Sequence, residues 1–286
     1  MTKPFDNDYR PTEAGIFKIP EAEYRKIKAA NITYLKLFNR SPLHVWTAFN
    51  DPEAEIISAT YAMVQGTAFH WSVLEPDRLK TDVAIDPGWS KNATKYKEWA
   101  AEQGDRIIIS ALDFRNVRRM AEKIYKRESA MRFLKSGYPE VSMIWFEEEF
   151  NLWCKGRLDW ITGDGGTLID LKKTKIATKW AFEGSIRRYL YNHQAAHYCR
   201  GYRAITGRKP DKWLWIVSEI DPPNEANVFA ADMAAVEQAE IDVEQWYRMY
   251  SQCEETGIWG GYPDDIIELG YDYDAAVSAG DDDIQW

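Results

Sequence analysis

Apolar and polar positions divide the chain into a mostly helical first part and a second part that opens with strands. Apolar residues recur at helical spacing up to about residue 135. The predicted helices are 21–29, 32–39, a segment after Ser41-Pro42, 56–74, 95–102 and 113–135, with a short strand at 106–109. Asn31 and Ser110 are the expected N-terminal caps, and proline suits a first helical turn. Residues 1–20 have no such period and are predicted to be an irregular arm.

From Val141 the pattern changes to that of β-strands. Three apolar stretches, VSMIWFEEEF, LWCKGRLDWI and TLIDLK, are separated by turn residues at Asn151 and at 163–166. A helix over 178–202, strands over 213–219 and 226–230, and a helix over 232–255 follow. This order, without internal repeats, predicts an α/β or α+β domain with a central mixed β-sheet flanked by helices.

Composition indicates a globular protein. Hydrophobic residues make up 45% of the 286 residues and aromatic residues 14%, which disordered chains lack. No apolar run approaches the roughly 20 residues that cross a bilayer, and the first residues contain no apolar signal core. We therefore expect a cytoplasmic protein without a membrane partner. Three separated cysteines, none in a CxxC arrangement, predict neither a disulfide framework nor a zinc knuckle.

Charge is distributed unevenly along the chain. The formal net charge is −9, but residues 263–286 hold eight acidic side chains and no Lys or Arg. The first 262 residues carry 36 basic against 37 acidic groups, so a nucleic-acid partner is not excluded. The expected organisation is an arm with the first helix (1–30), a main domain (31–262) and an acidic, flexible tail (263–286).

Two aspartates on the predicted hairpin are the strongest chemical signal. If 163–166 is a four-residue turn, Asp159 lies across from Asp170, and Lys172 projects on the same face as Asp170. Opposed carboxylates repel each other, and a cation between them would remove the penalty. Oxygen ligands favour Mg²⁺ or Mn²⁺, and such an ion beside an ammonium is suited to phosphodiester hydrolysis. Alternatively, both aspartates are solvated and pair with Arg157 and Lys172.

The motifs around these residues resemble those of the PD-(D/E)XK nucleases. GRLD ends at Asp159 and IDLK at Lys172, as in the family's acidic residue followed by a D/E-x-K triplet. NRSPLHVW (39–46), GTAFHWSVLEP (66–76) and a Q-x-x-x-Y motif are similar to the subgroup of RecB-type nucleases, lambda exonuclease and the RecE-type exonuclease VIII proteins of phages and prophages. The resemblance covers about residues 31–230. It departs after the lysine, where the family has Thr or Ser and this chain has Lys173 before Thr174.

The resemblance implies a PD-(D/E)XK α/β core preceded by a helical region. It implies a Mg²⁺-dependent exodeoxyribonuclease, with Mn²⁺ as a substitute and one or two ions, that degrades linear double-stranded DNA 5′ to 3′ and leaves 3′ overhangs for recombination. The implied metal ligands are His70, Asp159, Asp170 and the Leu171 carbonyl. Lys172 would activate the water, and Gln194 and Tyr198 would place the scissile phosphate.

The resemblance also implies partners. It implies a ring-shaped homo-oligomer, a trimer or tetramer, around double-stranded DNA ends in a bacterial host cell. The predicted DNA-binding residues are Arg157, Thr174, Lys175, Arg187 and Arg188. Trp71, Trp180 and Tyr189 either stack on terminal bases or pack in the core. The terminal DDDIQW is similar to the tail of single-strand-binding proteins; it either recruits a single-strand annealing protein or a host replication protein, or is a solvated end.

Other readings of the same residues remain open. HQAAH at 193–197 is one letter from the zinc-protease motif H-E-x-x-H, but Gln194 cannot serve as its base. A Cas4-like or RecB-like single-strand nuclease would use the same site, although the iron–sulfur cysteines of Cas4 are absent. A non-catalytic DNA-binding or assembly protein with a vestigial site is a further alternative.

Overall fold

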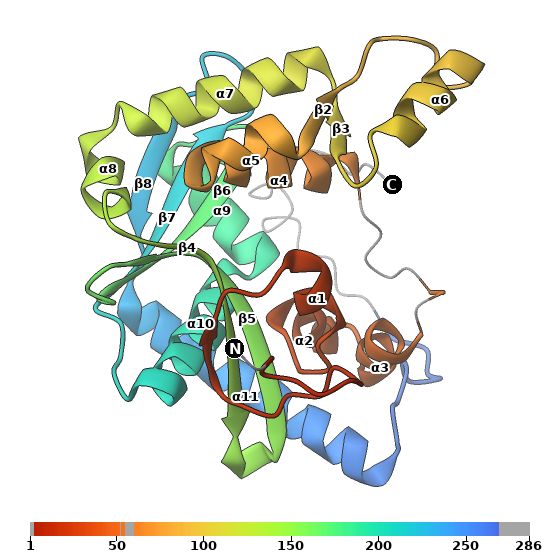
Figure 1. Ribbon diagram of the computed structural model, residues 1–286. Helices are drawn as coiled ribbons and strands as arrows, with labels where there is room; N and C mark the ends of the chain where they lie inside the picture. The colour runs from red at the N-terminus through yellow and green to blue at the C-terminus, as the bar shows by residue number, and fades with distance from the viewer. Residues whose placement is uncertain (1–2, 52, 55–59, 269–286) are drawn as a thin grey trace.

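A six-stranded mixed sheet organises the chain (Figure 1). The computed structural model describes residues 3–51, 53–54 and 60–268, and its strands lie in the order β1-β4-β5-β6-β7-β8. Strand bounds are Gly15–Phe17 (β1), Gly137–Glu147 (β4), Leu152–Thr162 (β5), Thr167–Thr174 (β6), Lys212–Glu219 (β7) and Ala226–Ala230 (β8). Only β6 and β7 pair in parallel within this sheet. β2 (Val83–Ile85) and β3 (Ile107–Ile109) form a separate parallel pair. The predicted central mixed sheet is confirmed.

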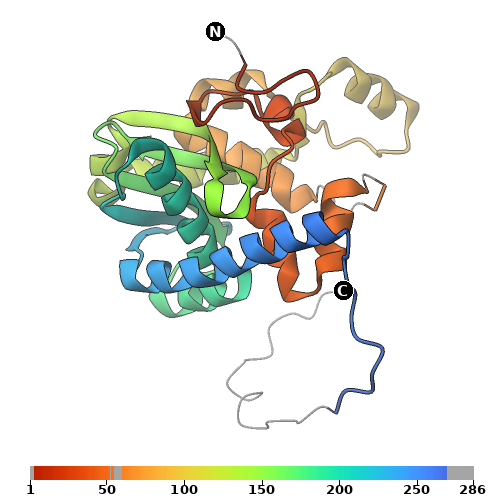
Figure 2. The same cartoon turned by 90° about the horizontal axis from the view of Figure 1, so that it is seen from below.

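Helices cover both faces of the sheet. Their bounds are Glu21–Lys26 (α1), Ile32–Leu35 (α2), Pro42–Asn50 (α3), Tyr61–Leu74 (α4), Pro76–Thr81 (α5), Thr94–Glu102 (α6), Ala111–Tyr125 (α7), Glu128–Leu134 (α8), Lys179–Tyr189 (α9), Tyr191–Thr206 (α10) and Met233–Thr256 (α11), with 3₁₀ turns at Lys36–Asn39 (η1) and Glu148–Phe150 (η2). In β7, Trp213 and Trp215 pack with α9, α10 and α11, whereas Leu214 and Ile216 pack with α4 and α7. Figure 2 shows α11 alongside α10. Burial on both sides explains the continuous apolar run of β7.

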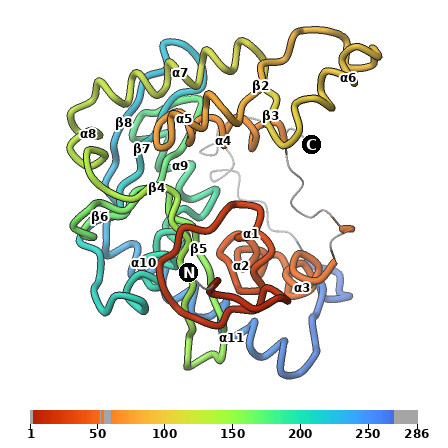
Figure 3. The backbone as a smooth tube through the Cα atoms, in the orientation of Figure 1, coloured from red at the N-terminus to blue at the C-terminus, as the bar shows by residue number. Residues whose placement is uncertain are grey.

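The N-terminal segment lies against β4 and β5 (Figure 3). β1 pairs with β4, so the arm is not wholly irregular as predicted. Ala30 N–H donates to the Trp153 carbonyl, and Lys155 N–H donates to that of Ala30. The Lys155 ammonium donates to the carbonyls of Tyr24, Arg25 and Ile27. Because every proton of that buried ammonium has a carbonyl acceptor, the segment is fixed to β5.

Two long predicted helices are each divided in the structure. The expected helix 113–135 is α7 and α8, separated at Arg127, whose extended backbone lets its side chain pair with Glu225. The expected helix 178–202 is α9 and α10, separated at Leu190 in the left-handed region. α5 and β2 were not predicted, and the start of the expected helix 56–74 lies partly outside the described residues. The caps at Asn31 and Ser110 are confirmed.

None of the helices in the described part of the chain is long and apolar enough to cross a bilayer. This finding agrees with the absence of a long apolar run in the sequence.

His197 lies in the core as a neutral imidazole. Its Nε2 is 3.1 Å from the Lys155 carbonyl oxygen, so this nitrogen must carry the proton and donate. Nδ1 then accepts from the Tyr247 hydroxyl at 2.6 Å. Burial lowers the pKa of His197 to about 3. The histidine is therefore part of the packing between β5, α10 and α11.

We expect acid to destabilise the fold through His197. The unfolded chain takes up a proton near pH 6.5, while the folded imidazole stays neutral down to about pH 3. The free energy of unfolding should fall through this window as pH drops, by up to about 1.4 kcal/mol per pH unit. Urea unfolding at a series of pH values measures it. His197→Gln removes the titrating group and should show a shallower slope; equal slopes would contradict the prediction.

Candidate active site

The hydrogen-bonded ladder between β5 and β6 ends where the two aspartates begin. Ile161 pairs with Leu168, as predicted, and the last pair is Trp160 with Ile169. Asp159 and Asp170 are next in register but form no ladder pair. Instead, Oδ2 of Asp159 accepts from the Leu171 N–H at 2.6 Å. The Asp159 carboxylate thus accepts a hydrogen bond from the Leu171 backbone N–H, which has no β5 backbone partner because β5 separates from β6 at this point.

Asp170 and Lys172 form a buried ion pair on the same face of β6. Lys172 Nζ lies 2.9 Å from Oδ1 of Asp170, a hydrogen bond, and 2.7 Å from Oδ2. The contact to Oδ2 lacks hydrogen-bond geometry, so this buried oxygen accepts no hydrogen bond from the described residues. Burial raises the pKa of Asp170 to about 6, opposed by Lys172 and assisted by Asp159. Burial lowers the pKa of Lys172, but the neighbouring Asp170 carboxylate raises it by more. The pKa of the ammonium is therefore above its usual value. Lys172 is thus a charged hydrogen-bond donor that keeps its proton in this arrangement.

Gln194 connects these two side chains. Its Nε2 donates to Asp170 Oδ1 at 3.0 Å, and its Oε1 accepts from Lys172 Nζ at 3.3 Å. α10 brings the amide to β6 after the break at Leu190. Besides the phosphate-placing role predicted for it, Gln194 thus holds the carboxylate and the ammonium in one geometry.

His70 brings α4 to the other aspartate. Its Nδ1 lies 3.4 Å from Oδ1 of Asp159 and 3.4 Å from Oε1 of Glu140. Burial alone would lower the pKa of His70, but Asp159 and Glu140 raise it well above 6.5. Burial likewise opposes ionisation of Asp159, yet the imidazolium of His70 and the Leu171 N–H lower the pKa of that carboxyl. At neutral pH we therefore expect a protonated imidazole between the two carboxylates.

Glu140 is a site residue that the sequence did not indicate. In β4, Pro139 pairs with Trp160 and Val141 with Leu158, which places Glu140 across from Asp159. Its φ of +49° is in the left-handed region, which a non-glycine residue seldom adopts and which is common at functional sites. In the sequence, Glu140 is marked only as an acidic residue directly before the apolar run of the strand.

Lys36 was also not predicted. Its pKa is lowered to about 7 by burial and by the neighbouring Lys172.

These donors fit a hard divalent cation. One nitrogen of His70 and one oxygen each of Glu140 and Asp159 lie within 4.8 Å of one another. Carboxylate oxygens with a single imidazole suit Mg²⁺ or Mn²⁺ rather than a soft metal. A cation would replace the proton that now balances the two carboxylates. Asp170 lies outside this group and faces Lys172, although its buried Oδ2 keeps a free lone pair.

Tyr198 packs into the sheet beside the site. A Cβ built on Gly156 would lie 2.7 Å from its ring, so the glycine of GRLD allows the phenol to lie flat on β5. Burial, with Asp170 adding to it, raises the pKa of Tyr198 to about 12. The hydroxyl is therefore a neutral donor at physiological pH.

The predicted DNA-binding residues lie in different surroundings. Arg157 is half-buried and pairs with Glu140 at 3.0 Å and Glu21 at 3.4 Å, which orients Glu140 toward the site. Thr174, at the end of β6, donates to the Ile176 carbonyl at 3.3 Å, and Lys175 follows it on the surface. Exposed positions on the last turn of α9 hold Arg187 and Arg188. Trp71 is buried and belongs to the core.

The zinc-protease reading has no support in the geometry. His193 pairs with Asp242 at 3.0 Å, whereas His197 is enclosed in the core. Among the described residues, neither histidine joins a group of three potential metal ligands.

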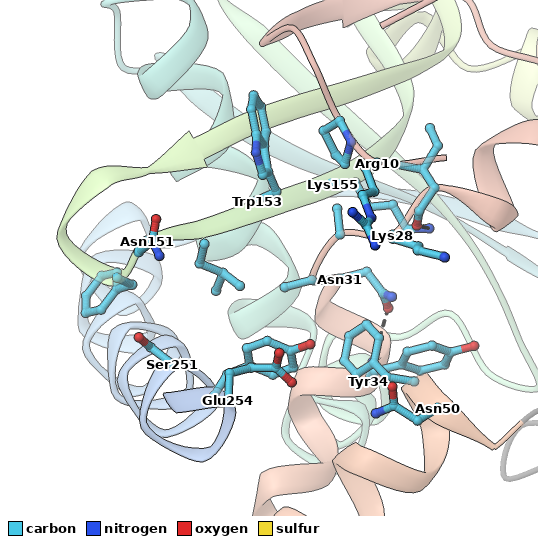
Figure 4. A pocket seen from close by; sticks show the side chains of 18 of the residues that line it. Arg10, Lys28, Asn31, Tyr34, Asn50, Asn151, Trp153, Lys155, Ser251 and Glu254 are labelled. Carbon is cyan, nitrogen blue, oxygen red and sulfur yellow. Dashed lines mark hydrogen bonds between the residues drawn. The ribbon is translucent and has the colours of Figure 1, made fainter. Parts of the chain in front are cut away.

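A wide hollow lies apart from these residues (Figure 4). It has a volume of about 1510 Å³ and is bounded by the N-terminal arm, α2, α3, β5 and α11. Arg10 and Lys28 line one side, and Tyr34 and Glu254 the other. None of the predicted metal ligands lines this hollow, so its volume does not make it the candidate active site.

Comparisons with known proteins agree with the fold. The family model of a PDDEXK-like domain of unknown function (DUF3799) matches residues 31–266. A crystal structure described as "Putative exonuclease" from Eubacterium rectale is similar, with a TM-score of 0.56 and 15% identity over 92% of this chain and 99% of that chain. At this identity the similarity concerns the fold. No curated protein sequence matches.

We expect metal binding to displace a proton from His70. Because its pKa is raised, the imidazole is protonated at neutral pH and must lose the proton to bind an ion. Mn²⁺ binding should release about one proton, and its affinity should rise about tenfold per pH unit below that pKa. Calorimetry in two buffers of different ionisation enthalpy measures both. His70→Gln should bind more weakly without proton release, and pH-independent binding by the wild type would contradict this.

Gly156→Ala should destabilise the protein by about 1–3 kcal/mol, because the new Cβ presses on the Tyr198 ring. Gly184→Ala in α9 is the matched control, since apart from its chain neighbours and its own helix backbone no atom of the described residues lies within 4 Å of its Cβ position. That change should be neutral or stabilising by up to about 1 kcal/mol. Denaturant unfolding compares the two, and equal stability of both variants would refute the close approach.

Proposed function

Because the chain belongs to the PDDEXK-like domain family DUF3799, we propose that it is a divalent-metal-dependent DNA exonuclease. The proposal is supported by one juxtaposition above all. A half-buried ammonium, Lys172, lies 2.7 Å from the buried carboxylate of Asp170, while Asp159 faces His70 and Glu140 one strand away. An acidic metal site beside a fixed positive charge is suited to phosphodiester hydrolysis.

In this proposal His70, Glu140 and Asp159 would hold the ion, and Asp170 and the Leu171 carbonyl would be its further ligands. When bound, Mg²⁺ or Mn²⁺ supplies the Lewis acidity that polarises the phosphoryl oxygen and lowers the pKa of a bound water. Arg157 keeps Glu140 oriented through their 3.0 Å ion pair. The number of ions is one or two.

Lys172 acts in its charged form. The ammonium orients the attacking water and stabilises negative charge that develops on the phosphate. Gln194 is a positioning residue for Lys172 and Asp170, and it keeps an amide near the scissile phosphate. The neutral Tyr198 hydroxyl is the second group in the predicted Q-x-x-x-Y motif. Each of these side chains is held by a described contact, so little reorganisation is needed for reaction.

The finer assignment is a RecE-type enzyme that degrades linear duplex DNA 5′ to 3′ and leaves 3′ overhangs for phage-type recombination. Arg187, Arg188, Thr174 and Lys175 would contact phosphates next to the site. A ring-shaped trimer or tetramer would concentrate basic residues along the duplex despite the net charge of −9. Recruitment of an annealing or replication protein by DDDIQW is part of the same proposal; residues 269–286 lie outside the described residues.

Linear duplex labelled at the 5′ or the 3′ end, incubated with Mg²⁺, tests the proposal. We expect loss of the 5′ label first and accumulation of 3′ single strands, and no digestion of closed circles or after chelation of the metal. Asp170→Ala and Lys172→Ala should each lower the rate by about 10³-fold or more. Asp170→Ala should also weaken Mn²⁺ binding, whereas Lys172→Ala should not.

The controls separate the alternatives. Digestion of circles would indicate an endonuclease, and digestion of single strands alone would indicate a RecB-like enzyme. Binding without any cleavage would favour the non-catalytic reading, and an active Lys172→Ala variant would refute the mechanism. Thermal unfolding of each variant checks that the loss is not a loss of fold.

A further inference from the structure

Tyr191 packs directly on the proposed catalytic lysine. The Lys172 ammonium lies 4.6 Å from the centre of the Tyr191 ring, within cation–π range. Tyr191 is the first residue of α10 and is partly buried against the core. Its ring therefore forms the wall of the site on the α10 side.

A second tyrosine extends this wall to the surface. Tyr189 stacks on Tyr191, with ring centres 5.6 Å apart and an interplanar angle of 29°. Tyr189 is 51% exposed, so the outer ring of the pair meets solvent. Tyr189 is connected to the Lys172 ammonium through the Tyr191 ring, which contacts both.

The backbone is held in a strained conformation that makes this stack possible. Residues two apart on a continuous helix point about 200° away from each other, so in the single helix predicted from sequence the two rings would not meet. Leu190 instead has φ 55° and ψ 48°, a left-handed conformation that costs a non-glycine residue about 1 kcal/mol or more. Its side chain packs on the core, which offsets that cost.

Two basic residues contact Tyr189, one at its backbone and one at its ring. Lys36 Nζ donates to the Tyr189 carbonyl at 2.8 Å and fixes the end of α9. The Arg188 guanidinium lies 5.7 Å from the centre of the Tyr189 ring, on an exposed turn. A half-exposed aromatic face is thus combined with a cation within reach of a phosphate.

We propose that Tyr189 is a stacking platform for an unpaired nucleobase next to the scissile phosphate, with Arg188 holding the phosphate of that nucleotide. This inference rests on the proposed nuclease function and adds a substrate feature to it: the strand reaches the site with its base unstacked. Base–aromatic stacking tolerates any sequence, as an exonuclease without sequence preference requires. The strain at Leu190 is then a structural requirement of DNA binding.

The test measures binding without turnover. A single-stranded-ended duplex in Ca²⁺ in place of Mg²⁺ gives the dissociation constant for wild type, Tyr189→Phe and Tyr189→Leu. We expect Tyr189→Phe to bind like wild type and Tyr189→Leu to bind about tenfold more weakly, the equivalent of one stacked base. With Mg²⁺, the loss should appear in KM rather than kcat. Tyr262→Leu, which removes a tyrosine 66% exposed beside α3, is the matched control and should bind like wild type.

A positional readout completes the test. 5-Iodouracil placed at the nucleotide beside the cut should crosslink to Tyr189, as mapped by mass spectrometry of the peptide. A dissociation constant of Tyr189→Leu within twofold of wild type, or a crosslink to another residue, would overturn the platform while leaving the nuclease proposal intact. Absence of any DNA binding or cleavage by the wild type would overturn both.

Discussion

The neutralisation of buried carboxylates is the constraint on which the centre of this structure depends. The half-buried Glu140 and the buried Asp159 and Asp170 occupy successive strands, where three uncompensated negative charges would be unstable. His70 of α4 faces both Glu140 and Asp159, Arg157 of β5 also pairs with Glu140, and Lys172 of β6 pairs with Asp170. The separation of β5 from β6 creates the room for these partners. The sheet is therefore interrupted next to these carboxylates, between β5 and β6.

Backbone strain is found close to these carboxylates. Two non-glycine residues near the site have left-handed backbones: Glu140, which is itself one of the three carboxylates, and Leu190, which precedes α10. Each conformation is held by its surroundings: Arg157 pairs with Glu140, and the core packs on Leu190. Strain of this kind persists when the neighbouring structure determines it and when it orients a functional group. Here it turns a carboxylate toward His70 and brings two tyrosine rings together.

Much of this arrangement was accessible from sequence, because local chemistry determined it. The caps at Asn31 and Ser110, the four-residue turn and the pairing of Ile161 with Leu168 follow from short-range rules. Glu140 was missed because its role needs a register across two strands and a backbone conformation that no local signal encodes. The break at Leu190 was missed because no proline or glycine marks it. β1 was missed because a three-residue strand has too few positions to show an alternation.

β5 pairs with β6 only at Trp160 and Ile161, so the opposite end of β5 has no strand partner on that side among the described residues. Residues 152–158 of β5 lose a neighbour on one side, and a bare strand edge is a template for pairing with other chains. The backbone at Ala30 occupies part of that edge, held there by the carbonyls that surround the Lys155 ammonium. The N-terminal segment therefore covers part of this strand edge, and shortening it would expose backbone groups with which another chain could pair.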